Sequence, residues 1–214
     1  MPMSPASSAA PAADRPVADR ILDAAVACVA RVGVAKTTLD DVAKEAHCAR
    51  ATVYRCFPGR QALMRAVLDR EVATLAADVL DAAGRAESLA GAVEAVILTA
   101  AATFGSHPAL GFVVAHEPEL VAPQLSFDRG SALLMHAGAV VAPAFARFLP
   151  ADRAERLGEW VARITLSYLC NPIDHGHLDE PAFVRGLVAD FVLPGFTRSL
   201  STVAAVTARE GAPQ

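Results

Sequence analysis

The sequence has few cysteines and no long apolar run, and these absences exclude several classes of protein. Its four cysteines among 214 residues stand far apart without C-x-x-C spacing, which gives neither a zinc knuckle nor a disulfide framework. No uninterrupted apolar run reaches the roughly 20 residues that a membrane-spanning helix needs. Residues 1–15 are rich in proline, alanine and serine and lack the pattern of a signal peptide. We therefore expect a cytoplasmic protein with a disordered amino-terminal tail and no membrane segment.

The sequence also lacks the short patterns by which many enzymes are recognised. It contains no nucleophile elbow, no glycine-rich phosphate loop and no E-x-x-H pair of the kind that di-iron bundles use. We accordingly expect no catalytic activity, no cofactor and no metal site. The alternative is a helical enzyme whose acid-base pair lies among the histidines and glutamates.

Charge is distributed unevenly along the chain. The net charge of the whole sequence is −4, yet residues 16–65 hold eight basic and five acidic side chains, a local excess of +3. Residues 66–214 hold ten basic and 17 acidic side chains. Such a chain is suited to presenting only its amino-terminal part to a polyanion, because neutralising phosphates supplies most non-specific affinity for nucleic acid.

Apolar residues recur at three- and four-residue steps through most of the chain, and no strand alternation is evident, so the sequence predicts an all-α fold. Residues 16–64 form the first predicted domain, residues 65–200 a second helical domain, and residues 201–214 a flexible tail. The predicted helices outside the segment 37–60 cover residues 17–32, 63–84, 88–104, 109–116, 125–148 with a kink at Pro143, 152–169 and 181–192.

The segment 37–60 is the most informative part of the sequence. Its apolar residues predict two short helices that share a core and are joined by a tight turn. Thr38 is placed to cap the first of them. The outward residues of the second helix are hydroxylated or cationic, which suits a helix that enters the major groove of DNA. This arrangement is a helix-turn-helix.

Residues 17–68 resemble the amino-terminal domain of the TetR family of transcriptional regulators. The resemblance is carried by residues in the family's order and spacing, namely Thr37-Thr38, Asp41-Val42-Ala43, Ala46, Thr52-Val53-Tyr54, Phe57-Pro58-Gly59-Arg60 and Ala62-Leu63. It implies a three-helix DNA-binding domain followed by a helical domain for ligand binding and dimerisation.

Three residues depart from the family's pattern. His47 stands in the turn where the family usually has glycine, which reaches a left-handed conformation more readily. Cys56 stands where a histidine or tyrosine ring commonly helps to hold a phosphate, and a thiol is a weak donor. Arg60 replaces the usual lysine, keeps its charge and adds a forked donor.

The side chains on or beside the two short helices give the predicted DNA contacts. Thr38, Tyr54 and Arg60 are expected to touch phosphates, which sets the register without reading sequence. Arg50 is the candidate for reading a base. The expected base is guanine, because arginine pairs with the major-groove edge of guanine through two hydrogen bonds. The remaining candidates are Lys36 for a backbone contact, Thr52 for a thymine methyl or a phosphate, and Arg55 for either. A solvated polar face is the alternative for each of them.

The resemblance further implies a homodimer on a pseudo-palindromic operator and an apolar small-molecule ligand that releases DNA. The helices at 152–169 and 181–192 occupy the positions of the family's dimer helices, although they could instead close the monomer's core. The helices expected between residues 88 and 148 supply aromatic residues with few charges, which suits an apolar ligand, and polar residues there and on the next helix could orient its polar end. The candidate ligand-binding residues are Phe104, Phe112, Met135, His136, Phe145, Arg163 and Tyr168.

A metal-responsive regulator is an alternative. Possible ligands crowd the stretch 174–180, which contains His175 and His177, and His116-Glu117 with Glu119 forms another small group. Neither group has the spacing of a known metal site, so solvated loops are the preferred interpretation.

Overall fold

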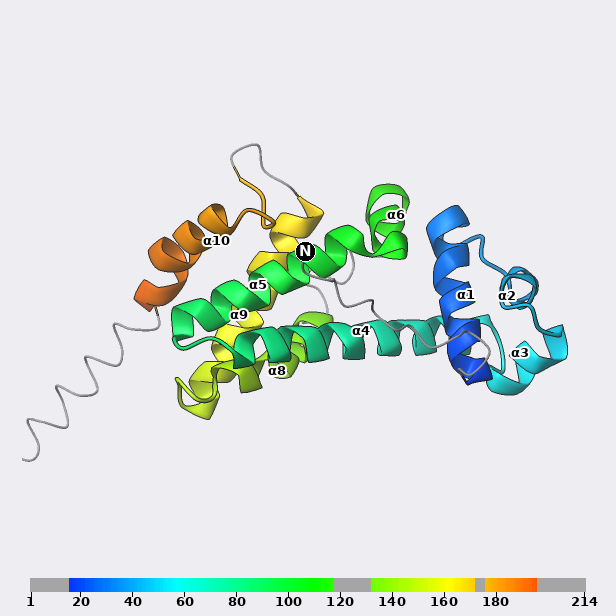
Figure 1. Ribbon diagram of the computed structural model, residues 1–214, viewed down its shortest axis with the longest axis horizontal. Helices are drawn as coiled ribbons and strands as arrows, with labels where there is room; N and C mark the ends of the chain where they lie inside the picture. The colour runs from blue at the N-terminus through cyan, green and yellow to red at the C-terminus, as the bar shows by residue number, and fades with distance from the viewer. Residues whose placement is uncertain (1–15, 118–131, 172–175, 196–214) are drawn as a thin grey trace, which may run out of the picture. The chain divides into compact units, whose positions relative to one another are not determined.

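The computed structural model describes residues 16–117, 132–171 and 176–195, except for the side chains of 114–115 and 132–137. Within these ranges the chain forms helices and no strand (Figure 1), which confirms the all-α prediction. The helices are α1 (Val17–Val32), α2 (Leu39–Glu45), α3 (Arg50–Cys56), α4 (Arg60–Gly84), α5 (Leu89–Ser106), α6 (Pro108–His116), α8 (Ala132–Phe145), α9 (Ala151–Cys170), α10 (Pro181–Leu187) and the π-helical turn η2 (Val188–Val192). Both predicted tails lie outside the described residues, and so does the part of the predicted helix 125–148 that precedes residue 132.

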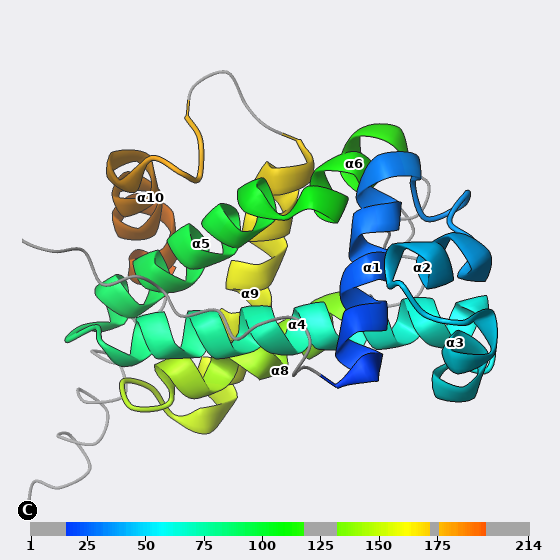
Figure 2. The same ribbon diagram turned by 45° about the vertical axis from the view of Figure 1, so that its right-hand side comes forward.

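The chain divides into two compact units. The first unit combines Met1–Glu71 with Pro108–Glu117, and the second combines Val72–His107 with Pro118–Gln214. Helix α4 therefore contributes to both. The sequence suggested a boundary after residue 64 and did not foresee that α6 packs with α1 (Figure 2).

The first unit has a small core made by α1, α2, α3 and the start of α4. Each helix contributes at least one side chain with no exposed surface, namely Ile21 and Cys28 from α1, Val42 from α2, Val53 from α3 and Leu63 from α4. Burying such side chains contributes roughly 1.5–3 kcal/mol each. The core therefore fixes which faces of α2 and α3 remain in solvent.

The second unit has a larger core, in which α5, α8, α9, α10 and η2 meet. Phe145, Ile97, Leu157 and Val184 are fully buried there. Among the described residues, α5 is the one helix long and apolar enough to cross a membrane, with a mean hydropathy of 1.5 over 18 residues. Its buried residues, Val93 and Ile97 among them, belong to this core.

The two helices predicted at 152–169 and 181–192 both form, with different details. Helix α9 begins after Pro150, one residue before the predicted start. The second ends its α-helical part at Leu187 and continues as the π-helical turn η2. Each helix packs one face against its own unit, since Leu157 and Val161 of α9 and Val188 and Val192 of η2 are buried. Phe191 is 70% exposed.

Candidate nucleic-acid interface

The geometry of α2 and of the turn after it follows from local chemistry. The Thr38 hydroxyl caps α2 by accepting a hydrogen bond from the Asp41 amide at 3.2 Å, as predicted. The same hydroxyl donates to the Asp41 carboxylate at 2.6 Å, and this hydrogen bond lowers the pKa of Asp41. In the turn, His47 adopts a positive φ of 49°, the conformation for which glycine is usual. Arg20 of α1 donates to the carbonyl of Ala46 at 2.9 Å, which ties the turn to α1.

Helix α3 anchors itself through Val53 and presents cations on its other side. Arg50, Tyr54 and Arg55 are exposed, whereas Thr52 is half-buried. Cys56 packs against the core of the unit, and the small contribution of its thiol to binding stays a prediction. The helix therefore keeps its cationic and hydroxylated side chains available to a ligand from solvent.

Arg50 is held by two partners from the same unit. Its guanidinium donates to the Tyr54 hydroxyl at 3.2 Å and lies over the Tyr54 ring, 5.3 Å from the centroid. Its Nε lies 2.9 Å from the Asp40 carboxylate at the start of α2. The hydrogen bond with Tyr54, followed by the charge of Asp40, raises the pKa of Arg50. The side chain is thus oriented before any nucleic acid arrives.

An open hollow of about 430 Å³ brings four of the seven predicted contact residues together. They are Thr38, Arg50, Tyr54 and Arg60, and the other lining residues are Ala35, Thr37, Leu39, Asp40 and Gly59. Lys36 is exposed beside Thr37, whereas Thr52 and Arg55 do not line the hollow. The hollow combines hydroxyls with two guanidinium groups, which are donors suited to phosphate oxygens.

Arg60 has a structural role that the sequence did not predict. Its Nε donates to the Thr37 carbonyl at 2.9 Å, and its Nη2 donates to the Val34 carbonyl. The guanidinium therefore holds the connector between α1 and α2, defined here as residues 33–38. Its phosphate contact stays a prediction, and a phosphate would meet an arginine that is already fixed in place.

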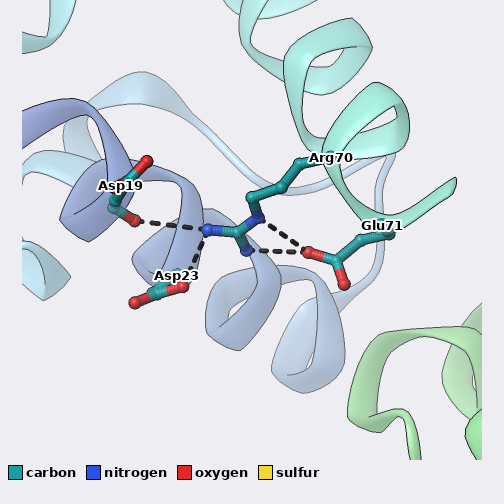
Figure 3. Close-up of polar contacts among 4 residues, drawn as sticks. All are labelled: Asp19, Asp23, Arg70 and Glu71. Carbon is teal, nitrogen blue, oxygen red and sulfur yellow. Dashed lines mark hydrogen bonds and ion pairs between the residues drawn. The ribbon is translucent and has the colours of Figure 1, made fainter. Parts of the chain in front are cut away.

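A second arginine fastens α1 to α4 within the first unit. Figure 3 shows the guanidinium of Arg70 between two groups: the carboxylate of Glu71, which follows it on α4, and Asp19 and Asp23 of α1. Arg70 donates to Glu71 at 2.7 and 3.0 Å, to the Asp23 carboxylate at 2.8 Å and to the Asp19 carbonyl at 3.4 Å. Burial opposes the charged form, but these hydrogen bonds outweigh it and raise the pKa of Arg70. The first half of α4 is thereby coupled to α1, the helix that packs against α2 and α3.

The predicted ligand-binding residues do not gather at one described site. Phe104 is half-buried on α5, and Phe145 is fully buried in the core of the second unit. Phe112 belongs to the first unit, where its ring stacks on His116 at 4.4 Å. The side chains of Met135 and His136 lie outside the description.

The remaining two candidates lie on α9. Arg163 pairs with Glu159, one turn earlier, at 2.6 Å. Tyr168 meets the edge of the Phe183 ring at a centroid distance of 5.7 Å. Between them, Thr165 is 5% exposed, and its buried hydroxyl has no hydrogen-bond partner among the described residues.

The metal alternative gains no support from the described part of the chain. There, no three side chains of histidine, cysteine, aspartate or glutamate lie close enough to hold a metal ion. The carboxylate of Glu117 accepts hydrogen bonds from backbone amides instead. His175 and Glu119 lie outside the described residues.

Comparison with known proteins gives consistent matches. The family described as bacterial regulatory proteins, tetR family, matches residues 21–67. An uncharacterized HTH-type transcriptional regulator of Mycobacterium tuberculosis is 30% identical over 191 residues, which cover 83% of this chain and 84% of that protein.

Solved structures share the fold at lower identity. The TetR family repressor AlkX from Dietzia sp., implicated in biodegradation of n-alkanes, aligns with a TM-score of 0.61 at 21% identity. That alignment covers 83% of this chain and 95% of AlkX. The regulator FadR from Bacillus subtilis in complex with stearoyl-CoA aligns with a TM-score of 0.55 at 14% identity, over 81% of this chain and 98% of FadR.

Proposed function

Because the chain belongs to the TetR family of helix-turn-helix transcriptional regulators, we propose that it is a repressor that binds a pseudo-palindromic operator as a homodimer and is released by an apolar small molecule. The observation that carries the proposal is the hollow beside α3. Arg50, Tyr54, Thr38 and Arg60 line it together from one compact unit. A single such unit covers too little DNA for regulatory specificity, so two copies related by a two-fold axis are required.

The side chains divide by what they can recognise. Tyr54, Thr38 and Arg60 hold phosphates and set the register, with Lys36 adding a backbone contact. Arg50 reads a guanine through two hydrogen bonds. Thr52 and Arg55 extend the contact along the groove.

Dimerisation is proposed through α9 and the helix formed by α10 and η2. Their inner faces are occupied within the subunit, which leaves outer side chains such as Phe191, 70% exposed, for a partner. Apolar side chains of this size contribute most to association when a second surface removes them from water.

The ligand proposal draws on the second unit and on the fold. The Thr165 hydroxyl on α9 is buried without a described partner, and an unsatisfied buried hydroxyl is costly unless something accepts or donates a hydrogen bond. A polar group on an otherwise apolar ligand would satisfy it. The same fold holds stearoyl-CoA in FadR, so it can accommodate a long alkyl chain. Release of DNA requires that this ligand binds the DNA-incompetent arrangement more tightly than the competent one.

The test is a selection from randomised duplexes with the full-length protein, followed by titration of the enriched site at several salt concentrations. Arg50→Ala should reduce discrimination at one base pair per half-site by about tenfold. Tyr54→Ala should weaken binding to all duplexes alike, because a phosphate contact carries no base information.

The matched control is Arg85→Ala, which removes an exposed arginine of the second unit that pairs with Asp81 and should leave binding unchanged. If the wild-type protein enriches no duplex, or if Arg50→Ala yields an unaltered selection profile, the proposed reading of DNA is wrong. Addition of long-chain acyl-CoA or n-alkanes to the wild-type complex tests the ligand. Release that follows chain length supports an apolar pocket.

A further inference from the structure

The residue that ends the α6 segment is a buried carboxylate. Glu117 is 7% exposed and is the one buried charged side chain among the described residues. Its Oε2 accepts the backbone N–H of Val34 at 2.7 Å, and its Oε1 accepts that of Ala35 at 2.8 Å. Both amides belong to the connector between α1 and α2, 82 or more residues away in the sequence.

Burying an ionised carboxylate is costly unless hydrogen bonds replace its hydration. Here two short bonds to a charged acceptor do so, and such bonds are stronger than neutral ones. The backbone at Gly33 also leaves room for the carboxylate. Gly33 has a φ of 86°, and a Cβ on it would lie 2.7 Å from Glu117 Oε1 and 2.8 Å from Phe112 Cε1. Only glycine permits both this backbone conformation and this approach.

The connector is held from its other side as well. Arg60 donates to the carbonyls of Val34 and Thr37, and the Thr37 hydroxyl donates to the Gly33 carbonyl at 2.7 Å. The peptide groups of Val34 thus bind Glu117 through the N–H and Arg60 through the C=O. The connector then ends at Thr38, the cap of α2 and a wall of the hollow.

We infer that Glu117 is a positioning residue for the DNA interface, an assignment that rests on the proposed function. Its carboxylate fixes the connector so that Thr38 and Arg60 face the duplex in one geometry. Both of its oxygens are engaged by the connector, so it does not itself contact DNA. The DNA-binding unit is therefore discontinuous in sequence, and residues 108–117 complete it.

The test is Glu117→Gln in the full-length protein. Glutamine has one carbonyl oxygen and one NH₂ group, so in the orientation of the native side chain it accepts one of the two amides and sets a donor against the other. The expected result is binding to the selected operator about tenfold weaker than wild type at a temperature where both proteins are fully folded. The sign is diagnostic, because simple electrostatics predicts tighter binding to a polyanion when an acidic side chain is removed.

Glu45→Gln is the matched control. Glu45 is exposed, belongs to the same unit and pairs with Arg31 at 3.0 Å, so its replacement removes a charge without touching the connector. It should leave DNA affinity unchanged or slightly raise it. Hydrogen exchange at the amides of Val34 and Ala35 supplies a second readout. Exchange there should accelerate in Glu117→Gln and not in Glu45→Gln.

The inference is overturned if Glu117→Gln binds the operator as tightly as wild type or more tightly. It is also overturned if the variant melts at a lower temperature but, while folded, binds the operator with unchanged affinity. If that variant does not fold, Glu117→Asp decides. It keeps the charge but is one methylene too short to reach both amides, so it should also bind more weakly, and wild-type affinity would overturn the inference. Failure of the wild-type protein to bind any duplex refutes the proposed function instead.

Discussion

Replacing Gly158 with alanine tests how closely α8 and α9 pack in the second unit. A Cβ at this position would lie 2.4 Å from the Gly138 carbonyl oxygen and 3.1 Å from Val141 Cγ2. A Cβ on Gly138 would likewise lie 2.7 Å from Glu159 Cα. Ordinary contact begins at 3.4 Å, so the two helices must separate by about 1 Å to admit the methyl group.

The magnitude follows from two opposing effects. Overpacking costs about 1–3 kcal/mol, and the upper end applies because the obstructing atom is backbone and cannot rotate away. Alanine returns about 1 kcal/mol through its higher helix propensity. The net loss of about 2 kcal/mol corresponds to a melting temperature about 4–8 °C lower for a chain of this length.

The assay is thermal unfolding followed by circular dichroism, at one protein concentration because the proposed dimerisation would make the midpoint concentration-dependent. Gly186→Ala in α10 is the matched control, since no atom of the described residues lies within 4 Å of its added Cβ. That variant should gain about 1 kcal/mol and melt about 2–4 °C higher. A Gly158→Ala protein that also melts higher would show that the helices are not in close contact at this crossing.

Two further predictions concern α2. Asp40→Asn should tighten binding to random-sequence duplex about threefold at low salt and by less at high salt. The reason is that the change releases Arg50 and removes a negative charge near the phosphates. Equal titration curves for the variant and wild type would contradict this. Thr38→Val should cost about 1 kcal/mol at pH 7 through the lost cap, and urea midpoints should show the difference from wild type shrinking toward pH 3. The lowered pKa of Asp41 stabilises the folded state above the ordinary carboxyl pKa, and this contribution is lost as the pH falls through the folded value.

The sequence predicted what short-range chemistry decides. The cap at Thr38 and the buried face of α3 each depend on neighbours within a few positions, and the structure confirms both. The turn at His47 was expected from the family resemblance, and its positive φ agrees with it. Helix α5 begins after Ser88, whose hydroxyl accepts from the Gly91 amide at 3.1 Å, and the sequence predicted a helix from residue 88.

The sequence could not predict contacts between residues far apart in the chain. Glu117 and Val34 are separated by 83 positions, and the only sequence signal at Glu117 was a histidine-glutamate pair that suggested metal binding. Likewise, the aromatic residues chosen for a ligand pocket share apolar character, but which of them point into one space depends on helix packing. Phe145 became core and Phe112 packed in the other unit.

The arginines show how structure refines a role that residue type leaves open. The sequence predicts a base contact for Arg50 and a phosphate contact for Arg60, but it does not show what holds either side chain. The structure gives Arg60 carbonyl partners in the connector, so it is engaged by neutral groups and keeps its charge for a phosphate. Arg50 instead faces the carboxylate of Asp40, so its charge is already partly compensated.

This difference bears on specificity. Any phosphate that approaches Arg50 must compete with Asp40, and a phosphate at an arbitrary site offers only charge in return. A guanine in the correct register offers two acceptors in the geometry of the guanidinium fork. We therefore expect Asp40 to lower affinity for random DNA more than affinity for the operator, and specificity is the difference between these two affinities. The Asp40→Asn protein should accordingly bind random duplex more tightly while its preference for the selected operator falls, and an unchanged preference would show that the pair has no part in discrimination.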